Sequence, residues 1–345
     1  MAKYQELFDH LRTAILRGEY APDDRLPSEN ALAIRYHVSR ITTKHALNAL
    51  ADADLIYRVQ GKGSFVKPHL ASRSRQLLLV LPFLDPQMGD YASGIKQELT
   101  GTTWQLSTCT TQQLKQRNLT DYAGIFYYPQ DLNAEMPTLI HCAQNRIPLV
   151  VLNDEPAQLA LPSVTSDNAT GGALAVEHLQ ALGHTRIAFF SRVAFWHDWT
   201  GTVAARFFGY MNHYHQPGVD GLKWAQALGT SLDVQTVAAY LRQEQISALI
   251  MGNDIEAVKL STGLTKLGWH LPEELSLVGF DDLAIAANNT PPLTTLTQDF
   301  PEIGRHAVDL LLAQINNPRS SCATRDTVAV KLVERASTMM KKERN

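Results

Sequence analysis

The sequence has few cysteines and lacks the features of several classes of protein. Its three cysteines, Cys109, Cys142 and Cys322, are widely spaced and form no metal-binding pattern, which indicates reduced, buried thiols. No segment approaches the roughly 20 consecutive apolar residues of a membrane-spanning helix. The first residues also lack the apolar run of a signal peptide. We therefore expect a cytoplasmic protein without membrane contact.

Sequence motifs of common catalytic sites are missing as well. There is no glycine-rich phosphate-binding loop, no Gly-x-Ser-x-Gly nucleophile elbow and no His-Glu-x-x-His zinc motif. His213 and His215 have the spacing of a metal-binding pair, but no third ligand is near them in the sequence. These absences favour a protein that is not an enzyme and that uses no cofactor or metal ion.

The chain carries little net charge, but its charge is unevenly distributed. All 345 residues together have a formal charge of −3. Residues 1–70 contain ten basic and eight acidic side chains, so the remainder is acidic. A mildly basic N-terminal part on an acidic body is typical of a protein that binds nucleic acid through its N-terminus. Because the positive excess is small, we expect a homodimer that places two N-terminal parts on one DNA site.

The segment that starts at Ser28 has the pattern of two short helices joined by a tight turn. Ser28 and Ser39 each stand where an N-cap is expected, and apolar residues follow both at helical spacing. The second helix, predicted over residues 39–51, opens with Ser39, Arg40, Thr42 and Lys44. Hydroxyl and cationic groups in the first turn of a helix suit the phosphates and base edges of a DNA major groove.

A β-hairpin is predicted directly after this helical pair. Two short strand patterns, 56–60 and 64–66, flank a glycine-rich tip. Glycine permits the positive φ and the close backbone approach of such a tip. We expect Lys62 to lie against phosphate or in the minor groove.

From Tyr4 to Val66 the sequence resembles the winged helix-turn-helix DNA-binding domain of the GntR family of bacterial repressors. The shared pattern includes Leu26-Pro27-Ser28-Glu29, Val38-Ser39-Arg40 and Gly61-Lys62-Gly63-Ser64-Phe65-Val66. The resemblance implies that Ser39, Arg40, Thr42 and Lys44 are DNA contacts of the recognition helix, and Gln60, Gly61 and Lys62 contacts of the wing. Ser28 is a further candidate DNA-binding residue. Asn30 and Lys44 stand where arginine is common, and lysine lacks the bidentate fork of a guanidinium. The alternative is a helical pair that binds protein or only dimerises.

From residue 77 onward, apolar strand patterns alternate with helical ones. This alternation predicts right-handed βαβ units in parallel sheets, and about 270 residues exceed one small sheet. We therefore predict an α/β fold with two lobes around a cleft. The expected domains are a winged helix-turn-helix at 1–69, a linker at 70–76 and an effector-binding and dimerisation domain at 77–345. The chain is expected to cross between lobes near 183, 294 and 322.

Polar side chains directly follow several of the predicted strands. They are Asn153, Asp154, Asp167, Asn253, Asp254, Asp281 and Asp282. Ligands of doubly wound sheets bind beyond the carboxyl ends of the strands, so we expect these groups at one cleft, although Asp282 is expected to cap the following segment. Arg206 is a lone cation in an apolar stretch. Carboxylates, amides and an arginine suit the hydroxyl groups of a sugar, and aromatic rings suit its apolar face; the candidate rings are Tyr91, Phe83 and Trp196.

Residues 77–335 resemble the effector domain of the LacI/GalR family, which is related to the (type I) periplasmic sugar-binding proteins. The pattern includes Leu182-Gly183-His184-Thr185-Arg186, Arg206-Phe207-Phe208-Gly209-Tyr210 and Val278-Gly279-Phe280-Asp281-Asp282. The resemblance implies that Arg206, Asn253 and Asp281 form hydrogen bonds to a sugar and that Phe300 packs beside it. A GntR-type head on a LacI-type body is the architecture of the arabinose-repressor group.

These patterns together predict a repressor of carbohydrate-utilisation genes. Two heads would bind a pseudo-palindromic double-stranded operator, and a small sugar or sugar derivative between the lobes would release them. A purine, nucleoside or sugar phosphate is the alternative effector, and the ligand would act as a corepressor if it favoured the DNA-bound state. A sugar-binding protein whose head contacts only protein is the alternative from another class.

Overall fold

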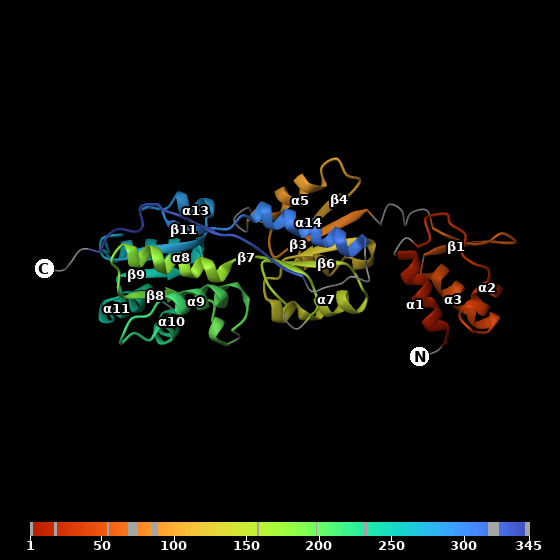
Figure 1. Ribbon diagram of the computed structural model, residues 1–345, viewed down its shortest axis with the longest axis horizontal. Helices are drawn as coiled ribbons and strands as arrows, with labels where there is room; N and C mark the ends of the chain where they lie inside the picture. The colour runs from red at the N-terminus through yellow and green to blue at the C-terminus, as the bar shows by residue number, and fades with distance from the viewer. Residues whose placement is uncertain are drawn as a thin grey trace.

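The computed structural model describes residues 3–16, 19–53, 55–67, 75–84, 89–156, 159–197, 199–230, 233–316 and 324–341. Within these residues the chain forms an N-terminal head and two α/β lobes, which follow one another along the long axis of Figure 1. Cys322 and the predicted linker except Arg75 and Gln76 lie outside the described residues.

The head contains three helices and a hairpin. Its elements are α1 (Lys3–Leu16), α2 (Glu29–Arg35), α3 (Arg40–Asp52), β1 (Ile56–Val59) and β2 (Gly63–Val66). Leu7, Leu11 and Ile15 of α1 pack against Leu47 and Leu50 of α3 in one buried cluster. The strands of the hairpin pair antiparallel. The predicted helix pair and wing are confirmed to within about two residues.

Lobe 1 is a six-stranded sheet with helices on both faces. Its strands have the order β12-β7-β6-β5-β3-β4, and every neighbouring pair is parallel. The strands are β3 (Gln76–Leu81), β4 (Gln105–Thr110), β5 (Gly124–Tyr127), β6 (Leu149–Leu152), β7 (Ser163–Ser166) and β12 (Arg325–Val328). The helical segments are α5 (Tyr91–Leu99), α6 (Thr111–Leu114), η2 (Leu119–Asp121), α7 (Leu132–Gln144) and α14 (Phe300–Asn316). Cys109 and Cys142 are buried free thiols in this lobe, as expected.

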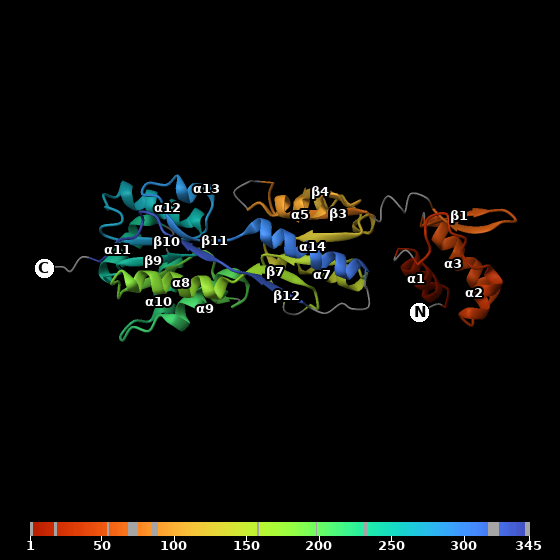
Figure 2. The same ribbon diagram turned by 45° about the horizontal axis from the view of Figure 1, so that its top comes forward.

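Lobe 2 has five strands in the order β13-β11-β10-β9-β8. The strands are β8 (Ile187–Phe190), β9 (Ala248–Met251), β10 (Ser276–Asp281), β11 (Thr294–Thr297) and β13 (Lys331–Val333), and β13 alone among them runs antiparallel to its neighbour. The helical segments are α8 (Asn168–Ala181), η3 (Phe195–His197), α9 (Gly201–His213), α10 (Gly221–Gly229), α11 (Val234–Gln243), α12 (Asp254–Lys266) and α13 (Ala284–Ala287). Figure 2 shows helices above and below the sheet.

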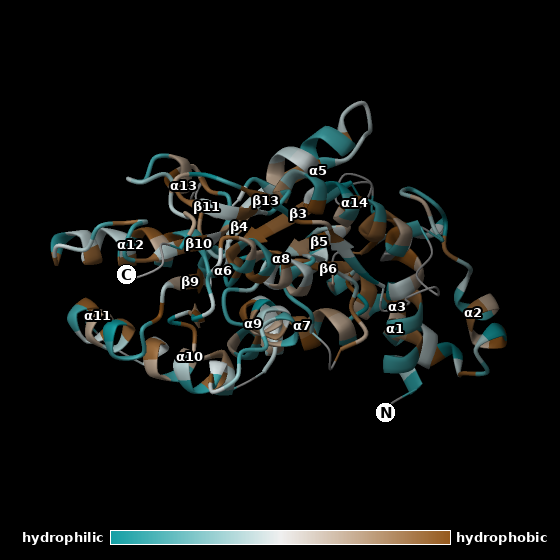
Figure 3. Ribbon diagram, turned by 60° about the vertical axis from the view of Figure 1, so that its left-hand side comes forward, coloured by the Kyte–Doolittle hydropathy of each residue, from teal (hydrophilic) through white to brown (hydrophobic). Residues whose placement is uncertain are grey.

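Several strands are apolar along their whole length, because both faces of each sheet are covered. The four residues of β5, β6, β8 and β9 are all buried, and Figure 3 shows brown, hydrophobic strands such as β3 between mixed helices. The edge strand β4 is different: its sequence Gln105–Thr110 is largely polar and only Cys109 is buried. For this reason the apolar pattern predicted the central strands but did not predict β4.

The crossings between the lobes differ from the predicted positions. The first joins β7 of lobe 1 to α8 of lobe 2 at Asp167, and not near 183, which lies at the end of α8. The second joins β11 to α14 at residues 298–299 rather than 294. The third joins β12 to β13 at residues 329–330 rather than 322. Gly183 follows the end of α8, and Thr294 is the first residue of β11, so both positions lie within lobe 2.

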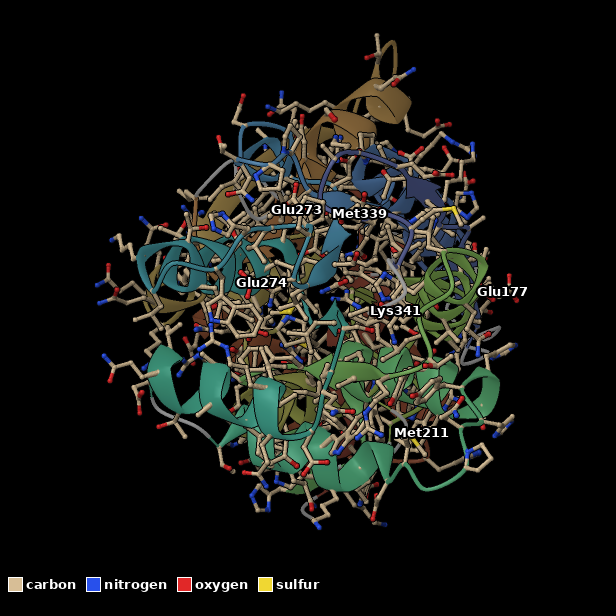
Figure 4. All side chains as sticks on the ribbon, turned by 90° about the vertical axis from the view of Figure 1, so that its left-hand side faces the viewer. Glu177, Met211, Glu273, Glu274, Met339 and Lys341 are labelled. Atoms are coloured by element: carbon tan, nitrogen blue, oxygen red, sulfur yellow. The ribbon has the colours of Figure 1, made fainter. Side chains whose placement is uncertain are left out.

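The final described segment belongs to lobe 2. Ser337 donates from Oγ to the Leu277 carbonyl over 2.6 Å, and the Lys341 amide donates to the Leu182 carbonyl over 2.8 Å. Figure 4, which faces this end of the lobe, shows Met339 and Lys341 near its centre, with Glu177 of α8 at the edge. Among the described residues, no helix is long and apolar enough to span a membrane.

Candidate functional site

A cavity of about 180 Å³ lies between the two lobes, at the carboxyl ends of their strands. Lobe 1 and the second crossing contribute Tyr128, Asn153, Gln298 and Phe300. Lobe 2 contributes Thr202, Val203, Arg206, Asn253, Ile255, Asp281 and Leu283. Because both lobes form its walls, a change in the angle between them changes the shape of the cavity.

Arg206 is the central charged group of this cavity. Its side chain is 4% exposed, and Nε donates to Oδ1 of Asn168 over 2.8 Å. Nη1 donates to the Gly252 carbonyl, and Nη2 lies 3.5 Å from Oδ1 of Asp281. The guanidinium also stacks on Phe280, with 3.7 Å between Cζ and the ring centroid. These contacts hold the planar fork in a single orientation, as a buried charge requires.

A close crossing of α8 and α9 positions this arginine. A Cβ added to Gly172 of α8 would lie 2.1 Å from the Arg206 carbonyl oxygen, and one on Gly209 of α9 would lie 2.0 Å from the Ala169 carbonyl oxygen. Only glycine fits at such distances. The two glycines therefore let the helices approach until Arg206 reaches Asn168.

Asp281 links the cavity to the crossings between the lobes. Its Oδ1 accepts a hydrogen bond from Nε2 of Gln298, the first residue of the second crossing. The side-chain oxygen of Gln298 accepts from Oγ of Ser166, which precedes the first crossing, over 2.6 Å. Burial raises the pKa of Asp281, and the Arg206 guanidinium opposes that shift. The contacts from Arg206 to Ser166 thus connect the cavity to the first and second crossings between the lobes.

Two residues of the cavity have backbone conformations that are unusual for side-chain-bearing residues. Asn153 has φ +59° and Asp281 has φ +119°, and such strained positions cluster at functional sites. Nδ2 of Asn153 donates to the Tyr128 hydroxyl over 3.0 Å. Oδ1 of Asn153 is buried without a hydrogen-bond partner among the described residues. An unsatisfied acceptor in a cavity wall is a position for a donor of a ligand.

Five of the residues predicted at the cleft line the cavity together: Asn153, Arg206, Asn253, Asp281 and Phe300. Asn253 also caps α12, because its Oδ1 accepts from the Glu256 amide over 2.8 Å. Asp254 does not reach the cavity. It is 0% exposed and accepts hydrogen bonds from the Thr295 hydroxyl and the Leu283 amide. It therefore supports the floor of the site rather than its surface.

The other predicted ligand residues lie outside the cavity wall. Asp167 caps α8 by accepting from both the amide and the hydroxyl of Thr170. Tyr91 is buried behind the wall, with its ring centroid 5.1 Å from that of Phe300. Phe83 is 48% exposed beyond the end of β3, and Trp196 packs against Phe195 in the core of lobe 2.

The structure also corrects the expected capping role of Asp282. Instead of capping the following segment, it accepts a hydrogen bond from Nη2 of Arg335 over 2.6 Å. The N-cap position of α13 is Leu283, which makes no side-chain cap.

Three polar residues of the cavity were not predicted: Tyr128, Thr202 and Gln298. Tyr128 ends an apolar run that predicts a strand, although it is the first residue beyond β5. Gln298 directly follows β11, and the sequence of this strand has no apolar run that would predict it. Thr202 lies in the first turn of α9. The rule that polar residues beyond a strand face the ligand would have found Gln298 if β11 had been predicted.

The predicted DNA-contact residues of the helical pair lie on the exposed surface of the head or cap its helices. Ser28 caps α2, and Ser39 caps α3 by accepting from the Thr42 amide over 3.1 Å. The hydroxyls of Ser39 and Thr42 are 2.8 Å apart. Arg40 and Lys44 are exposed on α3. This arrangement leaves the start of α3 open to a groove of DNA.

The wing is tied to the helix pair by a charged network. Glu29 accepts hydrogen bonds from Nη2 of Arg58 at 2.6 Å and from Nε of Arg40 at 3.5 Å. Nη1 of Arg58 also donates to Oδ1 of Asn48. At the tip, Gln60, Gly61 and Lys62 are exposed, and the Lys62 amide donates to the Val59 carbonyl. The network fixes the orientation of the hairpin relative to α3.

Comparisons with known proteins match both parts of the chain. The family model for bacterial regulatory proteins of the gntR family matches residues 3–66, and that for the periplasmic binding protein-like domain matches residues 176–338. The arabinose metabolism transcriptional repressor of Geobacillus stearothermophilus is 26% identical over 336 residues, which cover 91% of this chain and 92% of that protein. The HTH-type transcriptional regulator reg1 of Streptomyces lividans is 30% identical over 266 residues, which cover 71% and 76%.

The fold also matches solved structures. The LacI family transcriptional regulator of Enterococcus faecalis V583, solved with bound ribose, has a TM-score of 0.61 and 24% identity, covering 77% of this chain and 100% of that one. The similarity confirms the predicted two-lobed fold, and the family models confirm the predicted combination of domains.

Proposed function

The chain belongs to the bacterial HTH-type transcriptional regulators, and from this membership we propose that it represses sugar-utilisation genes until a small neutral sugar binds between its lobes. In this proposal Arg206, Asn153, Asn253 and Asp281 form hydrogen bonds to the hydroxyl groups of the sugar. Phe300 covers an apolar face of its ring. The head binds operator DNA in the cytoplasm and releases it when the sugar changes the angle between the lobes.

The observation that carries this proposal is the polar but charge-balanced wall of the cavity. Arg206 lies 3.5 Å from Asp281, so the cation is already paired. A phosphate group would meet the carboxylate of Asp281 as well as the guanidinium, and like charges repel. Hydroxyl groups can instead donate to Asn153 Oδ1 and accept from amide and guanidinium groups. The balance therefore favours a neutral polyol over a sugar phosphate.

The size of the cavity also supports a small ligand. Its volume of about 180 Å³ is below the roughly 300–1,000 Å³ of pockets for drug-sized molecules. The names of the relatives agree with this class, because one is a repressor of arabinose metabolism and one structural neighbour holds ribose. We propose a monosaccharide as the effector.

A homodimer on a pseudo-palindromic operator completes the proposal. Regulators that place a recognition helix in the major groove commonly bind two half-sites about one helical turn apart, and the symmetry of the operator then mirrors that of the dimer. A second head also offsets the small positive excess of the first. Closure of the lobes would change the distance between the heads and so weaken binding to fixed half-sites.

Thermal melting of the full chain tests the effector class. The ligands are arabinose, ribose, glucose, ribose 5-phosphate and adenosine, each over a range of concentrations. A ligand at 100 times its Kd stabilises the protein by about 2.7 kcal/mol. We expect at least one neutral sugar to raise the melting temperature of the protein and also to lower its affinity for the operator. Stabilisation by adenosine or the phosphate alone would contradict the proposed class, and tighter operator binding would show a corepressor.

A further inference from the structure

A large apolar side chain lies on the exposed side of α3. Thr43, Ala46, Leu47 and Leu50 of this helix are buried against the head. Ile41 is 72% exposed and takes no part in the core of the head. An exposed β-branched residue has a lower helix propensity than alanine or lysine. Ile41 therefore contributes little to the folding of the helix that carries it.

The position of Ile41 is that of a residue that meets base edges. In helix-turn-helix proteins the N-terminal residues of the second helix of the pair contact bases in the major groove. Ile41 is the second residue of α3 and stands between Arg40 and Thr42. Lys44, one turn further on, is also exposed. The side chain thus projects from the surface that the sequence predicts to contact DNA, within the segment that the gntR family model matches.

The polar groups beside Ile41 are already engaged within the head. The hydroxyls of Ser39 and Thr42 are 2.8 Å apart, and Ser39 also caps the helix. Nε of Arg40 donates to Glu29, which Arg58 of the wing holds as well. These groups have to exchange an internal contact for a contact with DNA, whereas an alkyl group has no such contact to lose. Ile41 is therefore preorganised for the groove.

DNA offers few apolar groups to such a side chain. In the major groove, the apolar group that distinguishes one base pair from the others is the C5-methyl group of thymine. We propose that Ile41 contacts a thymine methyl group and so specifies a T·A pair in each half-site of the operator. This assignment rests on the proposed operator binding and adds a base preference to it.

Single exposed apolar side chains are common on protein surfaces, so the test needs a matched residue. Ile34 provides one, because it is 76% exposed in the same head but lies near the end of α2. The substitutions Ile41→Ala and Ile34→Ala remove similar amounts of exposed apolar surface. Both residues lie outside the core of the head, so the two variants are expected to melt like the unchanged protein.

The operator is first obtained by selecting duplexes from a random 40-base-pair library with the full chain. Each thymine of the selected site is then replaced by deoxyuridine, which removes only the methyl group. Affinity is measured by fluorescence anisotropy at one salt concentration, because phosphate contacts make affinity depend on salt. We expect one thymine per half-site whose methyl group contributes about four-fold to affinity, the factor that corresponds to burial of one methyl group.

The variants decide whether Ile41 is the contact. In Ile41→Ala the deoxyuridine effect at that thymine should disappear, and in Ile34→Ala it should remain about four-fold. Two results would overturn the assignment of Ile41 while leaving operator binding intact. One is an undiminished deoxyuridine effect in Ile41→Ala, and the other is an operator whose thymine methyl groups are all dispensable. Failure to select any duplex would overturn operator binding itself.

Discussion

At the scale of single residues, Arg206 both holds parts of the fold together and lines the cavity. Three of its nitrogens contact Asn168, Gly252 and Asp281. A lysine has one point charge and no planar fork, so it cannot satisfy all three. We expect Arg206→Lys to weaken sugar binding roughly ten-fold or more, with operator affinity in the absence of sugar unchanged. Calorimetric titration and anisotropy measure the two quantities.

The control for this prediction is Arg242→Lys. Arg242 is an exposed arginine of lobe 2 that lies 4.0 Å from Glu274, far along the chain from the cavity residues of α9. The substitution Arg242→Lys should leave the affinities for sugar and for operator unchanged. A variant Arg206→Lys that binds sugar normally would remove Arg206 from the ligand site.

Asp254 makes stability depend on pH. Burial, followed by the nearby charge of Asp281, raises its pKa from 3.8 to about 7. The folded protein therefore holds this proton at pH values where the unfolded chain has lost it. The contribution of Asp254 to the free energy of unfolding consequently falls as pH rises from about 4 to about 7, by about 1.4 kcal/mol for each pKa unit.

The variant Asp254→Asn isolates this effect. An asparagine keeps the shape and can still accept from the Leu283 amide, but it does not titrate. Urea unfolding from pH 4 to pH 8 should show a flatter decline in Asp254→Asn than in the unchanged protein. Parallel curves would show that Asp254 does not titrate in this range.

At the scale of elements, the start of α3 combines a structural cap with the proposed DNA surface. Ser39 accepts from the Thr42 amide, and loss of an N-cap costs about 0.5–2 kcal/mol. We expect Ser39→Ala to lower the stability of the head by about this amount. Ser39→Asp retains the cap and should melt normally, yet its negative charge should weaken operator binding. Melting and anisotropy of both variants would separate the roles, and normal DNA binding by Ser39→Asp would place Ser39 away from the phosphates.

The elements also show what local sequence patterns can predict. The helix pair, the wing and the central strands were predicted because their signals are local: capping serines, a glycine-rich tip and runs such as Leu77–Leu81. The strands β4, β11, β12 and β13 were not, since they lie at or near sheet edges and contain polar residues such as those of Arg325–Val328. Their strand conformation depends on pairing with segments far away in the chain.

At the scale of the whole molecule, Gln298 connects the cavity to the first two crossings between the lobes. It accepts from Ser166 and donates to Asp281, so in the proposed function a ligand on Asp281 would act directly on both crossings. Allosteric coupling commonly changes affinity 5–150-fold, and it is reciprocal. We expect the Gln298→Ala protein to bind both sugar and operator. The factor by which each ligand weakens the binding of the other should fall to a few-fold.

Gln314 provides the matched control. It bridges α14 to both backbone groups of Leu149 within lobe 1, away from the crossings. Gln314→Ala should retain the full coupling factor, measured as sugar affinity with and without operator. If both variants keep full coupling, the signal passes through other contacts.

The sequence by itself determined the domain combination, the helix pair and hairpin of the head and five cavity residues, because caps, turns, buried strands and family motifs are local or fixed in spacing. Only the tertiary structure decided where the chain crosses between the lobes and which polar groups reach the cavity. Asp254 and Asn253 are neighbours in the sequence, yet one is buried beneath the site and the other lines it. That difference arises from packing between segments such as α12 and β11, and no local pattern specifies it.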